Sequence, residues 1–263
     1  MLTRSVRIIS ENLRFYFFLA LVVIVLETLR SLGTFGHSVN AGVIFVYSYL
    51  CANIPLVILH GTSLTSAASL RGDGRLKAGL KVAMIAAIIA GLTTALLLKM
   101  VIIKANSGVR TNPDYVAFFG VLVLAIPAVV TLLGSWVPAG IMQKAPGFIA
   151  AIGRGLMSIQ TVYWRLVVSL AAYILVAIIL GTAYGLITGK VPFLTTGNGG
   201  IDLPGIGYWY IVTLFGMFLL TYANVVICMD YMRIEKIDPE GGAPRTSAGP
   251  ITVPRVGRTS RHR

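Results

Sequence analysis

The sequence predicts an all-α, polytopic membrane protein built as a bundle of six transmembrane helices. Its 263 residues are 56% hydrophobic and only 12% charged, with a mean hydropathy of +0.84. A soluble domain carries about 25% charged residues, so a soluble enzyme is excluded, and the high hydrophobicity excludes a disordered chain. The apolar runs are continuous, whereas a β-barrel would show alternating segments of about 10 residues.

Six stretches are long and apolar enough to be spans, since a membrane helix needs about 20 mostly apolar residues. They are residues 13–32, 41–60, 78–103, 115–136, 163–187 and 206–229. Aromatic residues, which prefer the headgroup level, fall at several of these ends, including Trp136, Tyr163 and Trp164. We therefore expect residues 1–240 to form a six-helix transmembrane domain.

The basic residues predict the orientation of these spans. Of the 22 Lys and Arg residues, 17 lie before the first span, after the sixth, in the links after the second and fourth, or within the first four residues of the span that follows. The formal charge divides into +11 on that side and +2 on the other. Cytoplasmic segments are rich in Lys and Arg, which predicts cytoplasmic N- and C-termini in a bacterial inner membrane. The net charge of +13 thus reports topology and requires no nucleic-acid partner.

The segment after Pro146 has the pattern of an amphipathic helix. Its apolar residues recur at spacings of 1, 3, 4 and 3, which places them on one helical face: Phe148, Ile149, Ile152, Leu156 and Ile159. Arg154, Ser158 and Gln160 fall elsewhere. The segment is too short to span, so we expect an interfacial helix between the fourth and fifth spans.

Residues 241–263 form a basic tail without acidic residues. We expect disorder here, because the tail has no apolar period. Its five arginines are Arg245, Arg255, Arg258, Arg261 and Arg263. Arginine near an anionic lipid surface gains about 1 kcal/mol, which favours lipid contact or plain solvation over a nucleic-acid or protein partner.

Three ionisable residues sit at membrane depth. Glu27 and Arg30 are i, i+3 neighbours near the outer end of the first span, and Lys99 lies at a similar depth on the third. Such residues mark function by default, but all three are close enough to an interface to snorkel or pair. The pattern favours a structural ion pair, with a substrate or proton site as the alternative.

Small residues form ridges on two spans. Gly181, Gly185 and Gly189 make a double GxxxG motif on the fifth span. Ala83 begins a spacing-four ridge on the third that continues through Ala87, Gly91 and Ala95. Such ridges let helices approach closely in lipid, so we expect packing within the chain, or a dimer or heteromer face.

No catalytic constellation or cofactor motif is present, and we expect neither an enzyme nor a cofactor. His37 and His60 lie at opposite membrane faces, which argues against paired haem ligands. Charged residues of both signs follow the sixth span, from Asp230 through Arg233 to Glu240. This pattern is typical of a solvated helix end rather than a metal site.

Four short stretches around the last three spans form a recognisable set. They are Trp136-Val-Pro-Ala-Gly-Ile-Met, Ala150-Ala-Ile-Gly-Arg-Gly-Leu, Trp164-Arg-Leu-Val and Met229-Asp-Tyr-Met-Arg-Ile-Glu-Lys-Ile-Asp. Together they resemble a group of bacterial six-helix membrane proteins that includes the membrane region of glycerophosphoryl diester phosphodiesterases and the YciC-like proteins. The resemblance covers residues 1–240 and implies six spans with cytoplasmic links after the second and fourth.

Two positions depart from the pattern of that group. Gln143 or Lys144 stands where a Glu usually precedes the interfacial helix, and Gly155 follows Arg154 where the group has Ser. The resemblance implies a fold and a location. It does not carry over the phosphodiesterase chemistry, whose catalytic residues belong to a separate soluble barrel with no counterpart in these residues.

These observations lead to one expected function and one alternative. We expect a non-catalytic scaffold or accessory subunit that binds other membrane components: the lipid bilayer together with a membrane-protein partner or a second copy. The alternative is a transporter or channel for a small or lipid-like solute. Transporters usually show broken helices or midplane polar groups, and Pro55 and Pro127 are the only strong breakers within the spans.

Overall fold

The computed structural model describes residues 1–33, 38–60, 64, 73–107, 113–144, 147–195 and 200–237. Side chains are described for these residues except 38–41, 73–77, 96–107 and 113–119. The helices are α1 (Leu2–Glu11), α2 (Leu13–Ser31), α3 (Ser38–His60), α5 (Asp73–Ser107), α6 (Pro113–Leu133), α7 (Trp136–Met142), α8 (Phe148–Ser158), the π-helix η1 (Ile159–Tyr163), α9 (Trp164–Thr188) and α10 (Leu203–Ile234). Within the described residues the only β pairing is an isolated bridge between Thr195 and Ile201.

The structure confirms an all-helical chain with several helices able to cross a membrane. Five segments are long and apolar enough: Gly42–His60, Ala78–Ala95, Gly120–Met142, Phe148–Thr188 and Leu203–Ile234. The pair α1 and α2, bent by 76° at their break, adds a sixth if it is counted as one span. These segments overlap the last five predicted spans, and α2 coincides with the first. The described part of the chain is therefore consistent with a helical membrane bundle.

Helix α1 is an element that the sequence pattern did not reveal. It is too short and too charged to be a span, yet it is amphipathic: Ile8 and Ser5 are buried, while Arg7 is exposed. Arg4 reaches across to the end of α3, where Nη2 donates to the Ile58 carbonyl at 3.0 Å. Carbonyls in the last turn of a helix lack intrahelical partners, so Arg4 fastens α1 to the end of α3.

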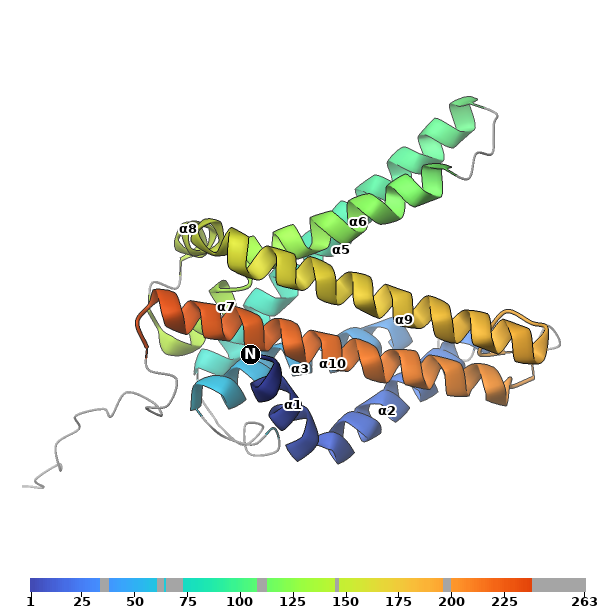
Figure 1. The fold of residues 1–263 in the computed structure, drawn as a ribbon, viewed down its shortest axis with the longest axis horizontal. Helices are drawn as coiled ribbons and strands as arrows, with labels where there is room; N and C mark the ends of the chain where they lie inside the picture. The colour runs from blue at the N-terminus through green and yellow to red at the C-terminus, as the bar shows by residue number, and fades with distance from the viewer. Residues whose placement is uncertain are drawn as a thin grey trace, which may run out of the picture.

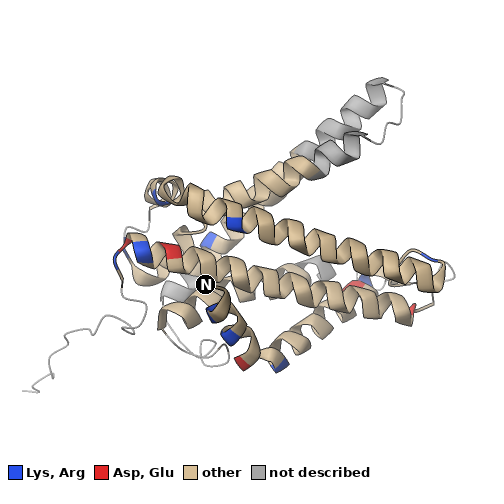
Figure 2. Cartoon of the chain, viewed as in Figure 1, with Lys and Arg blue, Asp and Glu red and all other residues tan. Residues whose placement is uncertain are grey.

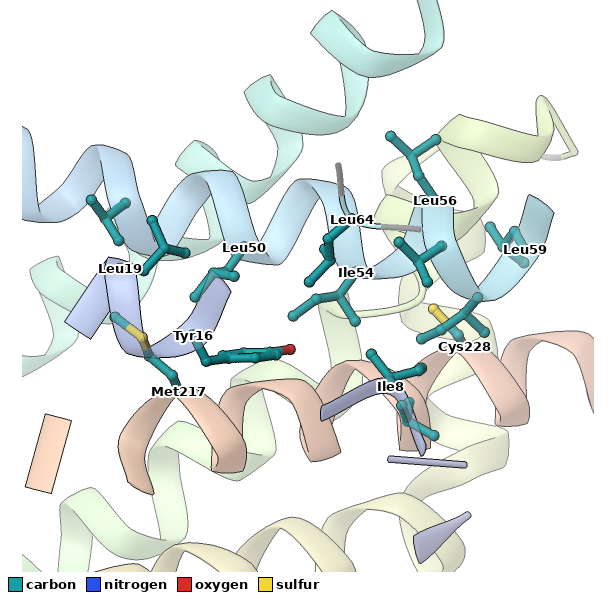
Figure 3. Close-up of a cluster of buried hydrophobic side chains, with 14 of the residues drawn as sticks. Ile8, Tyr16, Leu19, Leu50, Ile54, Leu56, Leu59, Leu64, Met217 and Cys228 are labelled. Atoms are coloured by element: carbon teal, nitrogen blue, oxygen red, sulfur yellow. The ribbon is translucent and has the colours of Figure 1, made fainter. Parts of the chain in front are cut away.

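The core lies where α2, α3 and α10 meet, with α1 closing one side. Tyr16, Leu50, Ile54 and Met217 are fully buried there and point toward one another (Figure 3). Tyr16 also makes an edge-to-face contact with Phe218, with ring centroids 5.6 Å apart. Close packing is what holds helices together where lipid is as apolar as the side chains.

The chain reverses between α6 and α9 through three short elements. α6 ends at Leu133, three residues before the end of the predicted span, and α7 follows after Gly134 and Ser135. Gln143 then adopts a left-handed conformation, with φ of 57°, and ends α7. α8 is seen nearly end-on while α9 lies across the view (Figure 1), so α8 departs from the axis of α9.

Burial is uneven across the described helices. Of the residues in the apolar segment of α3, 56% are buried, and in that of α10 the share is 44%. In the apolar segment of α5 only 11% of the residues are buried, and in the segment that covers α8 and α9 only 6%. The end of α5 and the start of α6 run side by side away from the other helices (Figure 1), while the rest of α5 contacts α3 and α7. The chain thus has a well-packed part around α2, α3 and α10 and a loosely packed part formed by α5, α6 and α9.

Candidate functional sites at the two ends of the bundle

The described Lys and Arg residues gather at one end of the bundle. We call this the α8 end, because it contains α8, the start of α9 and the end of α10 (Figure 2). Few lie at the opposite end, where α2 and α9 end and α10 begins; we call it the Lys190 end after its lysine. Each end holds one candidate site.

Arg154 forms the centre of the first site. Although it is a cation, it is only 5% exposed. Its Nη1 lies 3.3 Å from Oε1 of Glu235, its Nε donates to Ser135 Oγ at 3.3 Å, and its guanidinium sits 5.5 Å from the centre of the Tyr231 ring. Arg154 thereby joins α8 to the turn before α7 and to the end of α10.

Asp230 lies on α10, five residues before Glu235, and is only 3% exposed. The Ser158 hydroxyl donates to one of its carboxylate oxygens. Thr161 donates to the other at 3.2 Å, and Arg233 Nη2 lies 2.5 Å from that same oxygen. Thr161 belongs to the π-helix η1. π-helices are rare, and the hydrogen bond from Thr161 to Asp230 helps to hold η1 in place.

The prediction of a solvated exit from the last span is wrong for Asp230. Sequence reasoning treated Asp230 and Arg233 alike, since both follow an apolar run and alternate in sign. In the structure the Asp230 side chain is 4% exposed and that of Arg233 is 56% exposed. The difference arises because α8 and η1 fold over Asp230, a contact between residues about 70 positions apart that no local pattern reveals.

α8 is amphipathic as predicted, with its apolar residues facing outward. Ile149, Leu156 and Met157 are 84%, 58% and 72% exposed, whereas Arg154 and Ser158 face the protein. A Cβ on Gly155 would lie 2.5 Å from the Leu132 Cα. Gly155 therefore lets α8 lie directly against the backbone of α6.

The second site is a cavity at the Lys190 end. It measures about 320 Å³ and lies between α2, α3, α9 and α10. Glu27 and Arg30 line it and form an ion pair at 3.0 Å, with side chains 22% and 51% exposed. The Lys99 side chain, which was expected near this pair, lies outside the described side chains.

Aromatic and hydroxyl groups complete the lining of this cavity. Tyr47, Tyr173, Trp209 and Thr213 contribute to it, together with apolar side chains. Within the described residues, no protein group forms a hydrogen bond with the Tyr47 or Tyr173 hydroxyl. The cavity therefore combines a carboxylate, a guanidinium, three hydroxyl groups and an indole with apolar side chains.

An apolar groove lies beside this cavity and shares Tyr173 with it. The groove measures about 480 Å³ and runs along α9 past Gly181 and Gly185 to Lys190 and Tyr208. A Cβ on Gly181 would lie 3.3 Å from the Tyr208 hydroxyl oxygen, so this part of the GxxxG motif packs against α10. Gly189 serves differently, since its φ of 66° ends α9.

The small-residue ridge on α5 has no such neighbour among the described residues. Ala87, Gly91 and Ala95 are exposed, and a Cβ added to Gly91 would meet nothing within 4 Å. The two ridges predicted from sequence thus differ: Gly181 on α9 packs against α10, whereas the ridge on α5 is open among the described residues.

The described residues contain no group of three His, Cys, Asp or Glu side chains that could hold a metal ion. His60 is exposed at the end of α3, and His37 lies outside the described residues. Cys51 and Cys228 are both free. The arrangement of the described side chains supports binding and helix packing.

The basic tail falls outside the described residues, including all five of its arginines. The expected contact of this tail with anionic lipid therefore stays a prediction.

No family model, curated protein or solved structure matches this chain.

Proposed function

We propose that this chain is a non-catalytic multi-pass membrane protein that acts as a scaffold or accessory subunit and binds other membrane components. The observation that carries the proposal is the open face of α5. Ala87, Gly91 and Ala95 form a smooth ridge that no described part of the chain covers. Small residues are enriched where one membrane helix packs on another, so this face suits a helix from a partner or a second copy.

The contrast with the other helix-packing glycines supports this interpretation. A Cβ on Gly134 or Gly155 would come within 3 Å of neighbouring atoms, and one on Gly181 within 3.3 Å. Gly91 is different because its surroundings are empty. A ridge of the type used for packing, left open on a helix that projects with α6 from the bundle (Figure 1), is explained by a membrane partner.

Substitution of Gly91 tests the proposal. Gly91→Leu fills the ridge at a position where an added Cβ meets nothing within 4 Å, and we expect it to abolish a complex that wild-type protein forms in native membranes. Gly120→Leu on α6 is the matched control, since a Cβ there also meets nothing within 4 Å. Chemical cross-linking in membranes followed by mass spectrometry identifies the complex, whether homomeric or heteromeric.

Two outcomes would contradict the scaffold proposal. One is a wild-type protein that remains a partner-free monomer in membranes and in mild detergent. The other is a complex that survives Gly91→Leu as well as it survives Gly120→Leu.

The proposed orientation places both termini in the cytoplasm of a bacterial cell, with six spans in the inner membrane. The gathering of Lys and Arg at the α8 end (Figure 2) supports it, because basic residues are retained on the cytoplasmic side. α8 then lies in the cytoplasmic interface with Ile149 and Leu156 toward the acyl chains. A fluorescent protein fused after Arg263 should fluoresce, and a periplasmic reporter fused there should stay inactive.

The tail arginines, from Arg245 to Arg263, then lie beside the anionic cytoplasmic leaflet. Each would gain about 1 kcal/mol near such a surface. We expect a chain ending at residue 240 to lose enrichment of phosphatidylglycerol around the protein in mixed nanodiscs, whereas full-length protein retains it. Equal enrichment in both would contradict lipid contact by the tail.

The resemblance to the phosphodiesterase membrane region and YciC-like proteins is retained as part of this proposal. Two observations support it. The Trp136 stretch and the Arg154 stretch both lie in short helices, α7 and α8, between two long ones. Trp164 begins α9 after the intervening η1, where the resemblance has the entry to the next span.

Transport of a small or lipid-like solute is the second candidate function, favoured by the cavity around Glu27 and Arg30. Flux in proteoliposomes that is lost on Glu27→Gln or Lys99→Met would support it. Flux unchanged by both substitutions would contradict these assignments. Pro55 and Pro127 lie inside the continuous helices α3 and α6, so neither supplies the broken span that transporters usually show.

A further inference from the structure

The Glu27–Arg30 cavity presents two opposite charges to whatever enters it. The carboxylate and guanidinium are 3.0 Å apart and line a space of about 320 Å³, which lies within the range of about 300–1,000 Å³ typical of ligand pockets. A purely anionic ligand would be attracted by Arg30 but repelled by Glu27, and a cation would meet the reverse. A ligand that carries both charges satisfies both side chains.

The remaining lining groups fit the two halves of such a ligand. Trp209 adds an aromatic ring, and aromatic rings attract ammonium groups through their π-electron faces. The hydroxyls of Tyr47 and Tyr173 have no hydrogen-bond partner among the described residues and can donate to phosphate oxygens. Guanidinium groups bind phosphate with two parallel hydrogen bonds, which gives Arg30 the anionic half and Glu27 the cationic half.

The neighbouring groove indicates that the ligand is an amphiphile. It shares Tyr173 with the cavity and continues along Ile174, Ala177 and Ile178 on α9. Gly181 and Gly185, which have no side chains, keep it open. A cavity that holds a charge pair and lies beside an apolar groove on an exposed helix matches a headgroup followed by an acyl chain.

We propose that the Glu27–Arg30 cavity and the groove beside Tyr173 bind one zwitterionic phospholipid. The phosphate lies against Arg30, the ammonium lies against Glu27 and Trp209, and one acyl chain follows α9. This site is independent of the open face of α5, so a failure of the partner proposal leaves it intact, and the reverse also holds.

Competition between two phospholipids tests the site. Full-length protein in mild detergent is incubated with equal amounts of dioleoyl phosphatidylethanolamine and dioleoyl phosphatidylglycerol, and retained lipid is counted by native mass spectrometry. We expect about tenfold preference for the ethanolamine lipid, equivalent to about 1.4 kcal/mol. Glu27→Gln should reverse the preference, because only the cation remains, and Arg30→Gln should weaken retention of both lipids.

Glu11→Gln is the matched control, since Glu11 also forms an ion pair within its own helix, at 2.7 Å with Arg7, but on α1 and exposed. It should leave the lipid preference unchanged. A loss of fold would lower the unfolding temperature and retention of both lipids, and would not reverse their order. Equal retention of the two lipids by wild-type protein, or the same behaviour of Glu27→Gln and Glu11→Gln, would overturn the proposal.

A second comparison distinguishes a phospholipid from a water-soluble zwitterion. Free glycerophosphoethanolamine, a phosphodiester, has the same charges but no acyl chain, and we expect it to displace the lipid only at concentrations at least about a hundredfold higher, equivalent to about 2.8 kcal/mol. Gly185→Leu fills the groove, and a Cβ there meets only the Lys190 carbonyl oxygen at 3.7 Å. It should weaken lipid retention while Gly120→Leu does not. Equal potency of glycerophosphoethanolamine and lipid would overturn the assignment of an acyl chain to the groove.

Discussion

Arg154 Nη1 on α8 lies 3.3 Å from Oε1 of Glu235, just beyond α10. The two residues are 81 positions apart, and the guanidinium is almost entirely enclosed while the carboxylate is about a quarter exposed. This pair is the main charged connection between the amphipathic helix and the last span, and it makes the docking of α8 sensitive to either residue.

Removing Arg154 should destabilise the protein more than an ordinary surface pair would. Loss of one partner of a buried pair costs about 3–5 kcal/mol, and the partial exposure of Glu235 lowers our expectation to about 2–3 kcal/mol for Arg154→Met. Reversible unfolding in mixed micelles measures the change. A double-mutant cycle with Glu235→Gln should show coupling above about 0.5 kcal/mol, and strict additivity would contradict a functioning pair.

Asp230 and Arg233 form an ion pair whose two members should behave differently. Asp230→Ala removes the carboxylate that accepts from Ser158, Thr161 and Arg233, and a hydrogen bond to a charged group contributes about 1.5–3 kcal/mol. Ser158 and Thr161 keep backbone carbonyls as acceptors, so we expect a loss of about 1–3 kcal/mol. Arg233→Gln removes a largely exposed cation, which should cost less than about 1 kcal/mol. Unfolding free energies of the two variants test this asymmetry, and equal costs would show that the Asp230 carboxylate is not held by α8 and η1.

Gly155 and Gly153 are neighbours on α8 with opposite expectations. A Cβ at Gly155 would lie 2.7 Å from the carbonyl oxygens of Thr131 and Leu132, and α6 backbone cannot yield as a flexible side chain would. Overpacking costs about 1–3 kcal/mol, which we expect for Gly155→Ala. At Gly153 a Cβ meets nothing within 4 Å, so Gly153→Ala should be neutral or stabilise by up to about 1 kcal/mol. The same unfolding measurement checks both, and a cost for Gly153→Ala that equals that of Gly155→Ala would be inconsistent with the close approach.

Tyr16 and Thr221 join α2 to α10 inside the core. Their side-chain oxygens are 2.6 Å apart, and Thr221 also bonds to the Met217 carbonyl at 2.9 Å. Tyr16→Phe keeps the packing of the ring and leaves Thr221 its carbonyl partner. We therefore expect a loss of only about 0.6 kcal/mol, the average for hydrogen bonds between membrane helices. A loss above about 2 kcal/mol would indicate that the hydroxyl anchors more than this one contact.

Most helices could be predicted because each one depends on a local property. The predicted span 13–32 nearly coincides with α2, which ends at Ser31, and the amphipathic period after Pro146 identified α8. α1 was missed because a search for membrane spans looks for about 20 apolar residues, and this ten-residue helix with two arginines and a glutamate falls below that length. Its signal is the apolar stripe that includes Ile8, which a search at helical period would have found.

The candidate sites could be predicted only where both partners share one helix. Glu27 and Arg30 are three residues apart, so their pairing follows from helical geometry. The cavity that they line also needs Tyr47, Tyr173 and Trp209, which come from three other helices. The spacing of the apolar residues in α8 likewise did not show which face of the helix, the apolar one or the one with Arg154, would pack against the protein.

Hydropathy and the distribution of Lys and Arg were thus sufficient for an all-helical chain with membrane-spanning segments, because both are sums over local residue chemistry. The burial of Asp230, the different uses of the two glycine ridges and the cavity around Glu27 were decided by tertiary structure. Each depends on which helices touch, and contact between distant helices is set by packing over the whole bundle. The residue pattern shows which faces of a helix could be buried, and the helices packed around it determine which of those faces are buried.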